Sequence, residues 1–291
     1  MTKIFSVVSS KGGVGKTTET ANLGGILADM GMRILLIDAD VQPSLSKYYP
    51  LHHKAPFGLH AVITRGGSIS ADCVSKTTIP RLDIVLSDTP DGSLQTWLKD
   101  REDRLVIMKR AMRSPFVQDN YDVVIIDTQG AVGELQKTAA MAADLMISPV
   151  NPSILSAREF ASGTIAMLES LNRMADMSAE FRSGELVALI YAQERTNDAR
   201  MISDIIRQDF RTSTRARVLE TMIPSSTVYC AAATAQMPVH RYDRTSSNRV
   251  SAYEVMHQLV WELFPNLKGI YVDDIEHADD VDAQPFLTAG E

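Results

Sequence analysis

One stretch near the N-terminus constrains the fold more than any other part of the chain. Residues 9–18 read Ser-Ser-Lys-Gly-Gly-Val-Gly-Lys-Thr-Thr, between a largely apolar run at residues 4–8 and a helix-compatible segment that extends to Met30. Glycines allow backbone N–H groups to turn inward, and the first turn of the next helix adds its own free N–H groups and its positive dipole end. A strand, a glycine loop and a helix in this order hold the phosphates of a nucleotide.

The loop departs from the general phosphate-binding pattern at one position. That pattern has glycine five residues before Gly15, where this chain has Ser10, and a second lysine, Lys11, follows. We expect Lys16 to reach the β- and γ-phosphates and the hydroxyl of Thr17 to hold Mg²⁺. Two lysines beside a tight loop would repel each other without an anion, so a glycine-rich turn with no ligand is the weaker interpretation.

Two later strands are predicted to end in carboxylates. Residues 33–38 form a mostly apolar run that ends in Asp38, with Asp40 two residues further on, and residues 121–127 form another that ends in Asp127. Continuous apolar strands are typical of a parallel sheet that is buried on both faces, and ligand sites lie at the carboxyl ends of its strands. The sequence therefore predicts an α/β fold: a mostly parallel, doubly wound P-loop NTPase sheet flanked by helices.

These motifs resemble those of a known family. Residues 11–18, Lys-Gly-Gly-Val-Gly-Lys-Thr-Thr, resemble the deviant P-loop of the ParA/MinD/Soj ATPases, and residues 38–42, Asp-x-Asp-x-Gln, resemble the family's Walker A′ motif. The likeness spans about residues 1–265 and is weak between 44 and 120. It implies a set of residues around ATP: Lys11, Gly12, Gly13, Val14, Gly15, Lys16, Thr17, Thr18, Gly130 and Pro224.

The resemblance also implies chemical roles. Lys11, Lys16 and Asp40 are the implied catalytic residues: Lys11 reaches across to the nucleotide of a second subunit, and Asp40 orients the attacking water. Thr17, Asp40 and Asp127 are implied to surround the metal. The implied cofactors are therefore ATP and Mg²⁺, and ATP is implied to join two subunits into a homodimer that hydrolysis dissolves.

Three places depart from the family pattern. Val41 stands where the family has proline, Ser225 stands where it has arginine, and residues 128–130 read Thr-Gln-Gly where it has one or two prolines. Asp127-x-x-Gly130 instead resembles the beginning of switch II in small GTPases, in which the glycine N–H senses the γ-phosphate. We therefore expect the Gly130 amide to contact the γ-phosphate of a bound triphosphate.

The charge distribution suggests a partner. The chain carries a net charge of −7, yet residues 195–249 contain nine arginines and no lysine, against five acidic residues. ParA-type members bind DNA nonspecifically through basic residues late in the chain, and arginines that neutralise phosphates give such salt-dependent affinity. The alternative, that several of them only balance nearby acids, stays open. The expected DNA contacts are Arg195, Arg200, Arg211, Arg215, Arg217 and Arg249.

The chain is predicted to hold one ATPase domain, residues 1–267, with helical segments at 93–113 and 157–177, followed by an acidic, flexible tail at 268–291. No apolar run approaches the roughly 18 residues of a membrane span, and the first strand leaves no room for a signal peptide. MinD-type members end in a basic membrane helix, whereas this tail is acidic and contains proline. We therefore expect a cytoplasmic, nucleoid-associated protein with no membrane partner.

These observations predict an ATP-dependent switch that binds nonspecific DNA. It would hydrolyse ATP slowly until a ParB-like partner stimulates it, and so segregate plasmid, chromosomal or integrated mobile DNA. One alternative is a positioning ATPase for a protein cargo, such as a MinD-like system or a secretion or chemotaxis assembly. A second is an iron–sulfur reductase-type relative, which Cys73 and Cys230 support poorly because neither lies in a glycine-rich context.

Overall fold

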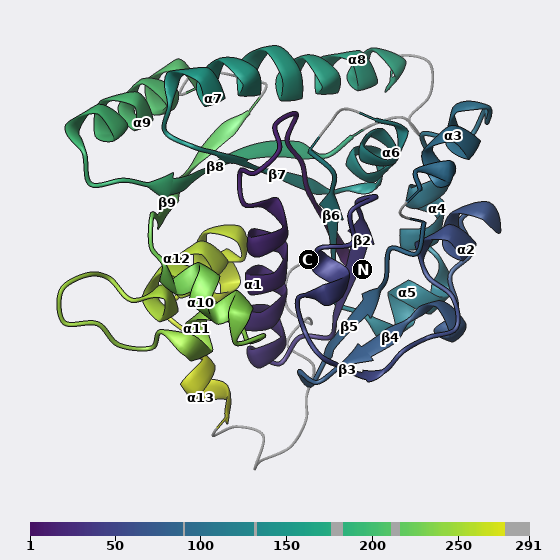
Figure 1. Cartoon of the computed structure of the whole chain (residues 1–291), viewed down its shortest axis with the longest axis horizontal. Helices are drawn as coiled ribbons and strands as arrows, with labels where there is room; N and C mark the ends of the chain where they lie inside the picture. Colours follow the sequence, from purple (N-terminus) through teal and green to yellow (C-terminus); the bar gives the residue numbers. More distant parts are fainter. Residues whose placement is uncertain (90, 131–132, 176–182, 211–215, 277–291) are drawn as a thin grey trace.

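The computed structural model describes residues 1–89, 91–130, 133–175, 183–210 and 216–276. Within these residues, nine strands form one sheet in the order β3-β4-β5-β2-β6-β1-β7-β8-β9 (Figure 1). The strands are β1 (Lys3–Val7), β2 (Ile34–Ala39), β3 (Leu51–His53), β4 (Ser75–Thr77), β5 (Leu82–Val85), β6 (Val123–Thr128), β7 (Leu145–Val150), β8 (Glu185–Gln193) and β9 (Arg217–Pro224).

The centre of this sheet is parallel, which confirms the predicted fold class. β6 lies between β1 and β2, and its register places Asp127 opposite both Val7 of β1 and Asp38 of β2. Among the described strands, antiparallel pairing is confined to β3 with β4 and β4 with β5. Parallel neighbours end at the same edge of a sheet, so the P-loop that follows β1 meets both aspartates.

Helices cover both faces of the sheet (Figure 1). α1, α10, α11, α12 and α13 lie on one face, and α2 to α9 lie on the other. The helices are α1 (Lys16–Asp29), α2 (Leu59–Thr64), α3 (Ser93–Lys99), α4 (Ile107–Met112), α5 (Pro115–Asn120), α6 (Glu134–Ala142), α7 (Ile154–Glu159), a π-helical turn (Phe160–Ile165), α8 (Ala166–Ala175), α9 (Asn197–Phe210), α10 (Val228–Thr234), α11 (Val239–Tyr242), α12 (Ala252–Leu263) and α13 (Val272–Glu276).

Side chains that alternate along β2 point to opposite faces of the sheet and pack in a separate hydrophobic core on each face. In β2, Ile34 and Leu36 pack in the cluster around α1 and α12, whereas Leu35 and Ile37 pack in the cluster around α2 to α6. All four side chains are fully buried, as a strand covered on both faces requires. None of the helices in the described ranges is long and apolar enough to cross a membrane.

The packed domain extends past the predicted boundary at residue 267. Val272 and Ile275 of α13 are buried in the same core as α1, and the Cγ2 atom of Ile275 lies 3.7 Å from the place where a Cβ on Gly31 would stand. Their three-residue spacing puts both apolar side chains on one side of a short helix, which the surrounding acidic residues obscure in the sequence. The rest of the acidic tail, residues 277–291, lies outside the described residues.

Candidate nucleotide site

The P-loop has the backbone shape that a phosphate cradle needs. Gly13 and Gly15 adopt positive φ angles of 72° and 90°, a region that side chains disfavour. Gly15 also faces the ring of Tyr191, because a Cβ there would lie 2.2 Å from the ring carbon Cε1. Helix α1 starts at Lys16 with no side chain capping it, so its first N–H groups face the loop.

Lys16 and Thr17, which follow this loop, lie close to Asp127 at the end of β6. The Lys16 ammonium is nearly buried and donates a hydrogen bond to the carbonyl oxygen of Lys11 at 3.2 Å. Burial lowers the pKa of Lys16, an effect that the charges of Asp127 and Asp40 oppose. The Thr17 hydroxyl donates to Oδ2 of Asp127 at 2.6 Å. A cation, a hydroxyl and a carboxylate therefore converge at the ends of β1 and β6.

Asp127 has the environment of a metal ligand. It is fully buried, burial raises its pKa to about 8, and its Oδ1 atom has no hydrogen-bond partner among the described residues. Buried carboxylate oxygens normally have a partner, so an open one beside Thr17 fits a divalent cation, which would favour the charged form. The donor set, a hydroxyl and carboxylates, is the kind that Mg²⁺ prefers.

Asp38 holds the loop that carries Asp40. Burial raises the pKa of Asp38 to about 6, although Ser46 donates two hydrogen bonds to its Oδ2, from the backbone N at 2.8 Å and from Oγ at 2.7 Å. The Asp40 N–H donates to Asp38 Oδ1 at 3.2 Å, and Ser87 Oγ donates to the Asp40 carbonyl at 2.6 Å. Sequence reasoning missed Ser46 and Ser87, because no local pattern distinguishes these serines from others.

Lys11 is bound within its own chain in this structure. Its ammonium lies 3.2 Å from Oε2 of Glu159 and 3.1 Å from Oγ of Ser156, both on α7. The neighbouring Ser10 donates from its backbone N to Oγ1 of Thr164 at 3.1 Å, in the π-helical turn. The Ser10 hydroxyl, which glycine lacks, donates to the carbonyl oxygen of Glu159 at 3.2 Å, so serine at position 10 adds a side-chain contact between the loop and this helix. Glu159, Ser156 and Thr164 gave no signal in the sequence.

The remaining residues predicted to contact the nucleotide lie either at the P-loop or, for Pro224, at the end of β9. Gly130 lies against the P-loop, since a Cβ on it would stand 2.6 Å from the Cα of Gly12, and Tyr191 forms a side-chain hydrogen bond with Thr18. Pro224 lies on the opposite side of the sheet centre from Asp40, at the end of the edge strand β9. There it lines a cavity of about 610 Å³. Gly12, Gly13 and Val14 line a second cavity of about 430 Å³, beside the start of α9.

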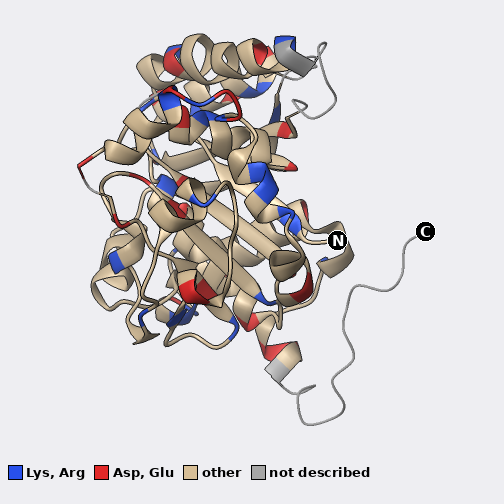
Figure 2. Ribbon diagram, turned by 90° about the vertical axis from the view of Figure 1, so that its right-hand side faces the viewer, with Lys and Arg blue, Asp and Glu red and all other residues tan. Residues whose placement is uncertain are grey.

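The structure separates the predicted DNA-binding arginines into two groups. Arg249 makes a two-fold contact with Asp243, at 2.7 and 2.8 Å, and Arg217 pairs with Glu185 at 3.1 Å. Arg195 and Arg200 have no acidic partner in the described part of the chain and line one cavity of about 380 Å³ between α9 and β9. Figure 2 shows basic and acidic segments interspersed over the face that it presents. Two more predicted contacts, Arg211 and Arg215, lie outside the described residues.

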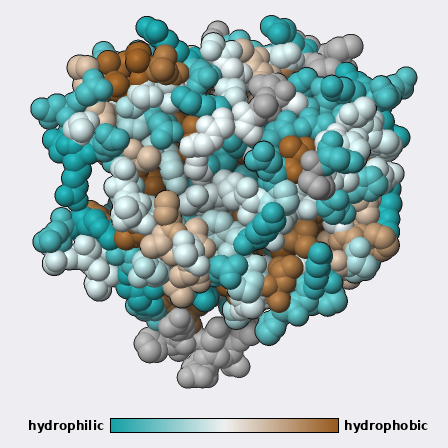
Figure 3. All heavy atoms as spheres, viewed as in Figure 1, coloured by the Kyte–Doolittle hydropathy of each residue, from teal (hydrophilic) through white to brown (hydrophobic). Residues whose placement is uncertain are grey.

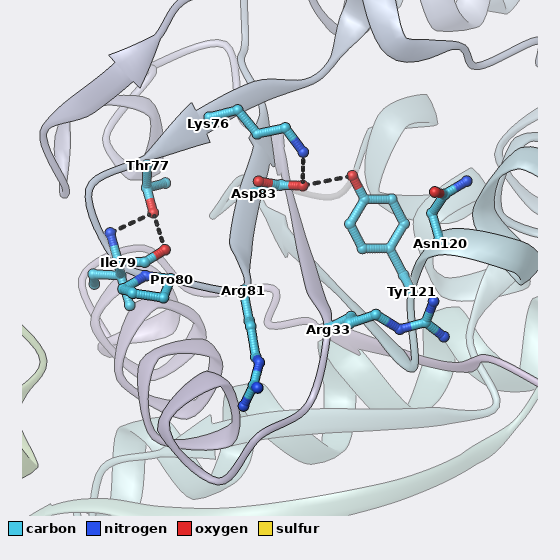
Figure 4. Close-up of a pocket in the computed structure, with 9 residues that line it drawn as sticks. All are labelled: Arg33, Lys76, Thr77, Ile79, Pro80, Arg81, Asp83, Asn120 and Tyr121. Carbon is cyan, nitrogen blue, oxygen red and sulfur yellow. Dashed lines mark hydrogen bonds and ion pairs between the residues drawn. The ribbon is translucent and has the colours of Figure 1, made fainter. Parts of the chain in front are cut away.

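A further cavity of about 390 Å³ lies at the opposite ends of the strands (Figure 4). Lys76 and the Tyr121 hydroxyl both bond to Oδ2 of Asp83, the latter at 2.8 Å. Arg33, which precedes β2, pairs with Asp122 at 2.8 Å. These residues stand at the amino ends of β2, β5 and β6, away from the P-loop. This cavity is therefore separate from the nucleotide site.

Known proteins with similar sequences include ATPases of the kind that this site indicates. A family model described as an AAA domain matches residues 2–180. The chain is 29% identical over 251 residues to the sporulation initiation inhibitor protein Soj of Bacillus subtilis, which covers 84% of this chain and 93% of Soj. It is 25% identical over 242 residues to the chromosome partitioning protein ParA of Caulobacter vibrioides, which covers 83% of this chain and 87% of ParA.

Solved structures share the fold. The Cyanothece McdA(D38A)–ATP complex superimposes with a TM-score of 0.72 at 19% identity, covering 90% of this chain and 96% of McdA. The septum site-determining protein MinD of Pyrococcus horikoshii, complexed with Mg-ADP, gives a TM-score of 0.68 at 20% identity, covering 92% and 98%. Both structures hold a nucleotide in this fold.

A parallel sheet with a two-lysine P-loop, and with aspartates at the ends of β2 and β6, defines a P-loop ATPase. The chain belongs to the AAA-domain family and, within it, to the ParA/MinD-type partition ATPases. This membership confirms the resemblance drawn from residues 11–18 and 38–42.

Proposed function

We propose that this protein is a DNA-partition switch that ATP joins into a homodimer and that hydrolysis resets. The observation that carries the proposal is the convergence of Lys16, Thr17 and Asp127, with Thr17 Oγ1 2.6 Å from Asp127 Oδ2. Phosphoryl transfer requires a phosphate cradle, a metal and an oriented nucleophile, and these residues supply the first two. ATP and Mg²⁺ are the proposed cofactors, and the products are ADP and phosphate.

Each residue has a defined part in this proposal. The P-loop amides and Lys16 bind the phosphates, and Thr17 and Asp127 hold Mg²⁺, which neutralises charge on the β- and γ-phosphates when bound. Asp40 orients the attacking water. Its Oδ1 already accepts a hydrogen bond from the N–H of Gln42 at 3.0 Å, which fixes the carboxylate relative to its loop. Gly130 N–H contacts the γ-phosphate, and the Pro224 backbone lies beside adenine.

Lys11 links hydrolysis to assembly. To reach the nucleotide of a second subunit it must leave Glu159 and Ser156. The Lys11 and Glu159 side chains are 36% and 52% exposed, and ion pairs this exposed contribute about 0–1 kcal/mol. The intrachain contact is therefore weak enough for a dimer to displace. We propose that turnover stays slow until a ParB-like activator binds the dimer in the cytoplasm.

The DNA contact is proposed for Arg195 and Arg200. Their guanidinium groups have no acidic partner among the described residues and lie on one cavity, whereas Arg217 and Arg249 are engaged within the chain. Arginines in such a position can neutralise phosphates without reading the sequence of the bases. The proposed cargo is plasmid, chromosomal or integrated mobile DNA at the nucleoid.

A second candidate is a positioning ATPase for a protein cargo, which exposed apolar residues favour. Ile154 and Leu155 on α7 are 48% and 65% exposed, and Met201 and Ile205 on α9 are exposed as well. Figure 3 shows an apolar patch at the upper left, where Figure 1 places α7 and α9. Apolar surface of this kind favours a protein partner. The two candidates share ATP chemistry and DNA anchoring and differ in the activator.

The test is binding to random-sequence duplex DNA with ATP, with ADP and without nucleotide, at two salt concentrations. We expect binding only with ATP and weaker binding at higher salt. Arg195→Ala and Arg200→Ala should each weaken it, whereas Lys54→Ala should not, because Lys54 is an exposed cation beside β3, at the other edge of the sheet. Equal binding in all three nucleotide states would contradict the proposal.

A further inference from the structure

Three glutamines meet at the carboxyl ends of β1 and β6, and the site described above uses none of their side chains. Gln95 lies on α3, Gln129 directly follows β6, and Gln136 lies on α6. The Gln95 side-chain amide donates to Oε1 of Gln129. Gln136 donates through Nε2 to the carbonyl of Ser9 at 2.8 Å and to that of Gln129 at 3.4 Å. We call these three residues the glutamine cluster.

Packing leaves the glutamine cluster little freedom. Gln129 is only 7% exposed, and Gln136 is fully buried. A Cβ on Gly133 would stand 2.3 Å from Nε2 of Gln129 and 2.4 Å from Oε1 of Gln95, so the backbone closes over both side chains. The residue after Gln129 is Gly130, which packs on Gly12 of the P-loop. The cluster therefore fixes the segment that touches the phosphate cradle.

One atom of the cluster is left open. Oε1 of Gln136 is buried without a hydrogen-bond partner among the described residues. Nearly all buried polar atoms in proteins have a partner, so an open acceptor next to Ser9 and Gln129 indicates that the arrangement is not built for stability alone. Nε2 of the same side chain donates to Ser9, which follows β1, and to Gln129, which follows β6.

The residues after Asp127 differ from the family pattern in a way that changes how the backbone is restricted. The family resemblance leads one to expect proline after Asp127, and a proline ring fixes the backbone by restricting φ. This chain has Thr128-Gln129-Gly130 instead, and glycine is the most mobile residue of all. Hydrogen bonds from Gln95 and Gln136 restrict the same backbone in a different way, through the side chain and the carbonyl of Gln129.

We propose that the glutamine cluster positions the Gly130 amide for ATP hydrolysis. Gln95 and Gln136 hold Gln129, and Gln129 holds Gly130 against Gly12, so that its N–H meets the terminal phosphate in one place. These are positioning residues, since none of them touches the reacting atoms. The inference rests on the proposed role of Gly130 in hydrolysis and is independent of DNA binding.

The test uses Gln95→Met, which keeps the length of the side chain and removes its hydrogen bond. Thr96→Met is the matched control, because Thr96 is an exposed neighbour on the same helix. The first readout is amide hydrogen exchange at residues 128–130 in nucleotide-free protein, which should accelerate several-fold in Gln95→Met alone. The second is single-turnover ATP hydrolysis, which should slow about fivefold while the Kd for ATP changes less than twofold.

A double variant tests whether the effect passes through Gln129. In a Gln129→Met background, Gln95→Met should cause no further change in either readout, because its partner is already gone. The inference is overturned if exchange at 128–130 is unchanged in Gln95→Met, if Thr96→Met behaves in the same way, or if the two glutamine variants are additive. Parallel loss of ATP affinity, hydrolysis rate and Tm would indicate a merely structural role and would also overturn it. The exchange readout remains decisive even if DNA binding is absent.

Discussion

Charged side chains are paired at the amino ends of the central strands and are buried with fewer partners at the carboxyl ends. At the amino ends, Arg33 pairs with Asp122, and Lys76 pairs with Asp83. At the carboxyl ends, Asp127 is buried with one oxygen that has no partner in the described part of the chain, and the Lys16 ammonium donates a hydrogen bond to a backbone carbonyl. Charged groups that are paired near the surface need no ligand to stabilise them. A desolvated charged group destabilises the fold until a ligand of opposite charge binds beside it.

This contrast identifies the functional end better than cavity shape does. The cavity in Figure 4 has basic residues on its wall, yet Arg33 and Lys76 among them each have an acidic partner within the chain. The cavity lined by Gly12, Gly13 and Val14 is only slightly larger, at about 430 Å³, but Gly13, with its positive φ angle, forms part of its wall. Backbone N–H groups and buried carboxylates, rather than the amount of empty space, distinguish the nucleotide site.

The largest expected effect comes from removing the P-loop cation. Lys16→Ala should raise the Kd for ATP at least about a hundredfold, because it removes charge-assisted hydrogen bonds to phosphate from a desolvated site. Lys76→Ala, at the amino ends, should leave the Kd unchanged. Titration with a fluorescent ATP analogue measures both. Similar losses in the two variants would remove the distinction between the two ends.

Asp40 should affect the rate rather than binding. Asp40→Ala should slow hydrolysis on the order of 100-fold, because the water loses its orienting carboxylate, while ATP remains bound and the dimer stays on DNA. Ser87→Ala is the milder counterpart, since it removes one hydrogen bond to the Asp40 carbonyl. Single-turnover kinetics and light scattering would check the rate and the dimer. A large loss of ATP affinity in Asp40→Ala would contradict this assignment.

Glu19 is another buried carboxyl group near the P-loop, and its protonation should affect the free energy of unfolding. It is buried in the first turn of α1, its Oε1 has no partner in the described ranges, and burial raises its pKa to about 8. Between about pH 4.5 and pH 8 the folded protein keeps a proton that the unfolded chain has released, so stability falls as pH rises through this window.

Glu19→Gln should therefore stabilise the protein by a few kcal/mol at pH 9 and by much less at pH 5. Urea unfolding at the two pH values gives the difference in free energy. Asp122→Asn, at the amino ends, should show the opposite sign at neutral pH, since hydrogen bonds from Arg33 help to hold the pKa of Asp122 below its usual range. A pH-independent effect of Glu19→Gln would show that the carboxyl is not protonated in the fold.

The strands that carry the site were predictable from sequence because their signals are local. Four apolar residues between Arg33 and Asp38 predicted β2, and the helix-compatible segment that extends to Met30 contains α1, Lys16–Asp29. The segment at 93–113 was predicted as one helix but forms α3 and α4 with a break between them. Leu105 and Val106 are both buried in the break, so the chain turns there to fill the core. Only tertiary packing decides such a break.

The site was predicted where its residues stand in one motif and missed where they come from elsewhere. Lys16 and Thr17 were predicted because they stand in the glycine-rich motif, and Asp127 because it ends an apolar strand. Glu159 and Gln95 were not, since each contacts the site from a distant part of the sequence, and Ser46 was not, since no local pattern distinguishes it from other serines. Residues of this kind carry ordinary polar side chains on helices and loops, and only the fold shows what they contact.

The smallest predicted effect concerns the contact that holds Lys11 in its own chain. Glu159→Gln removes the ion pair with Lys11 while Ser156 still accepts a hydrogen bond from it. Because an exposed pair contributes less than about 1 kcal/mol, ATP-dependent dimerisation should tighten by up to about fivefold, and less at high salt. Glu169→Gln, on the adjoining helix α8, is the charge-matched control. Sedimentation at several protein concentrations measures the change, and weaker dimerisation in Glu159→Gln would show that this glutamate supports the dimer instead of competing with it.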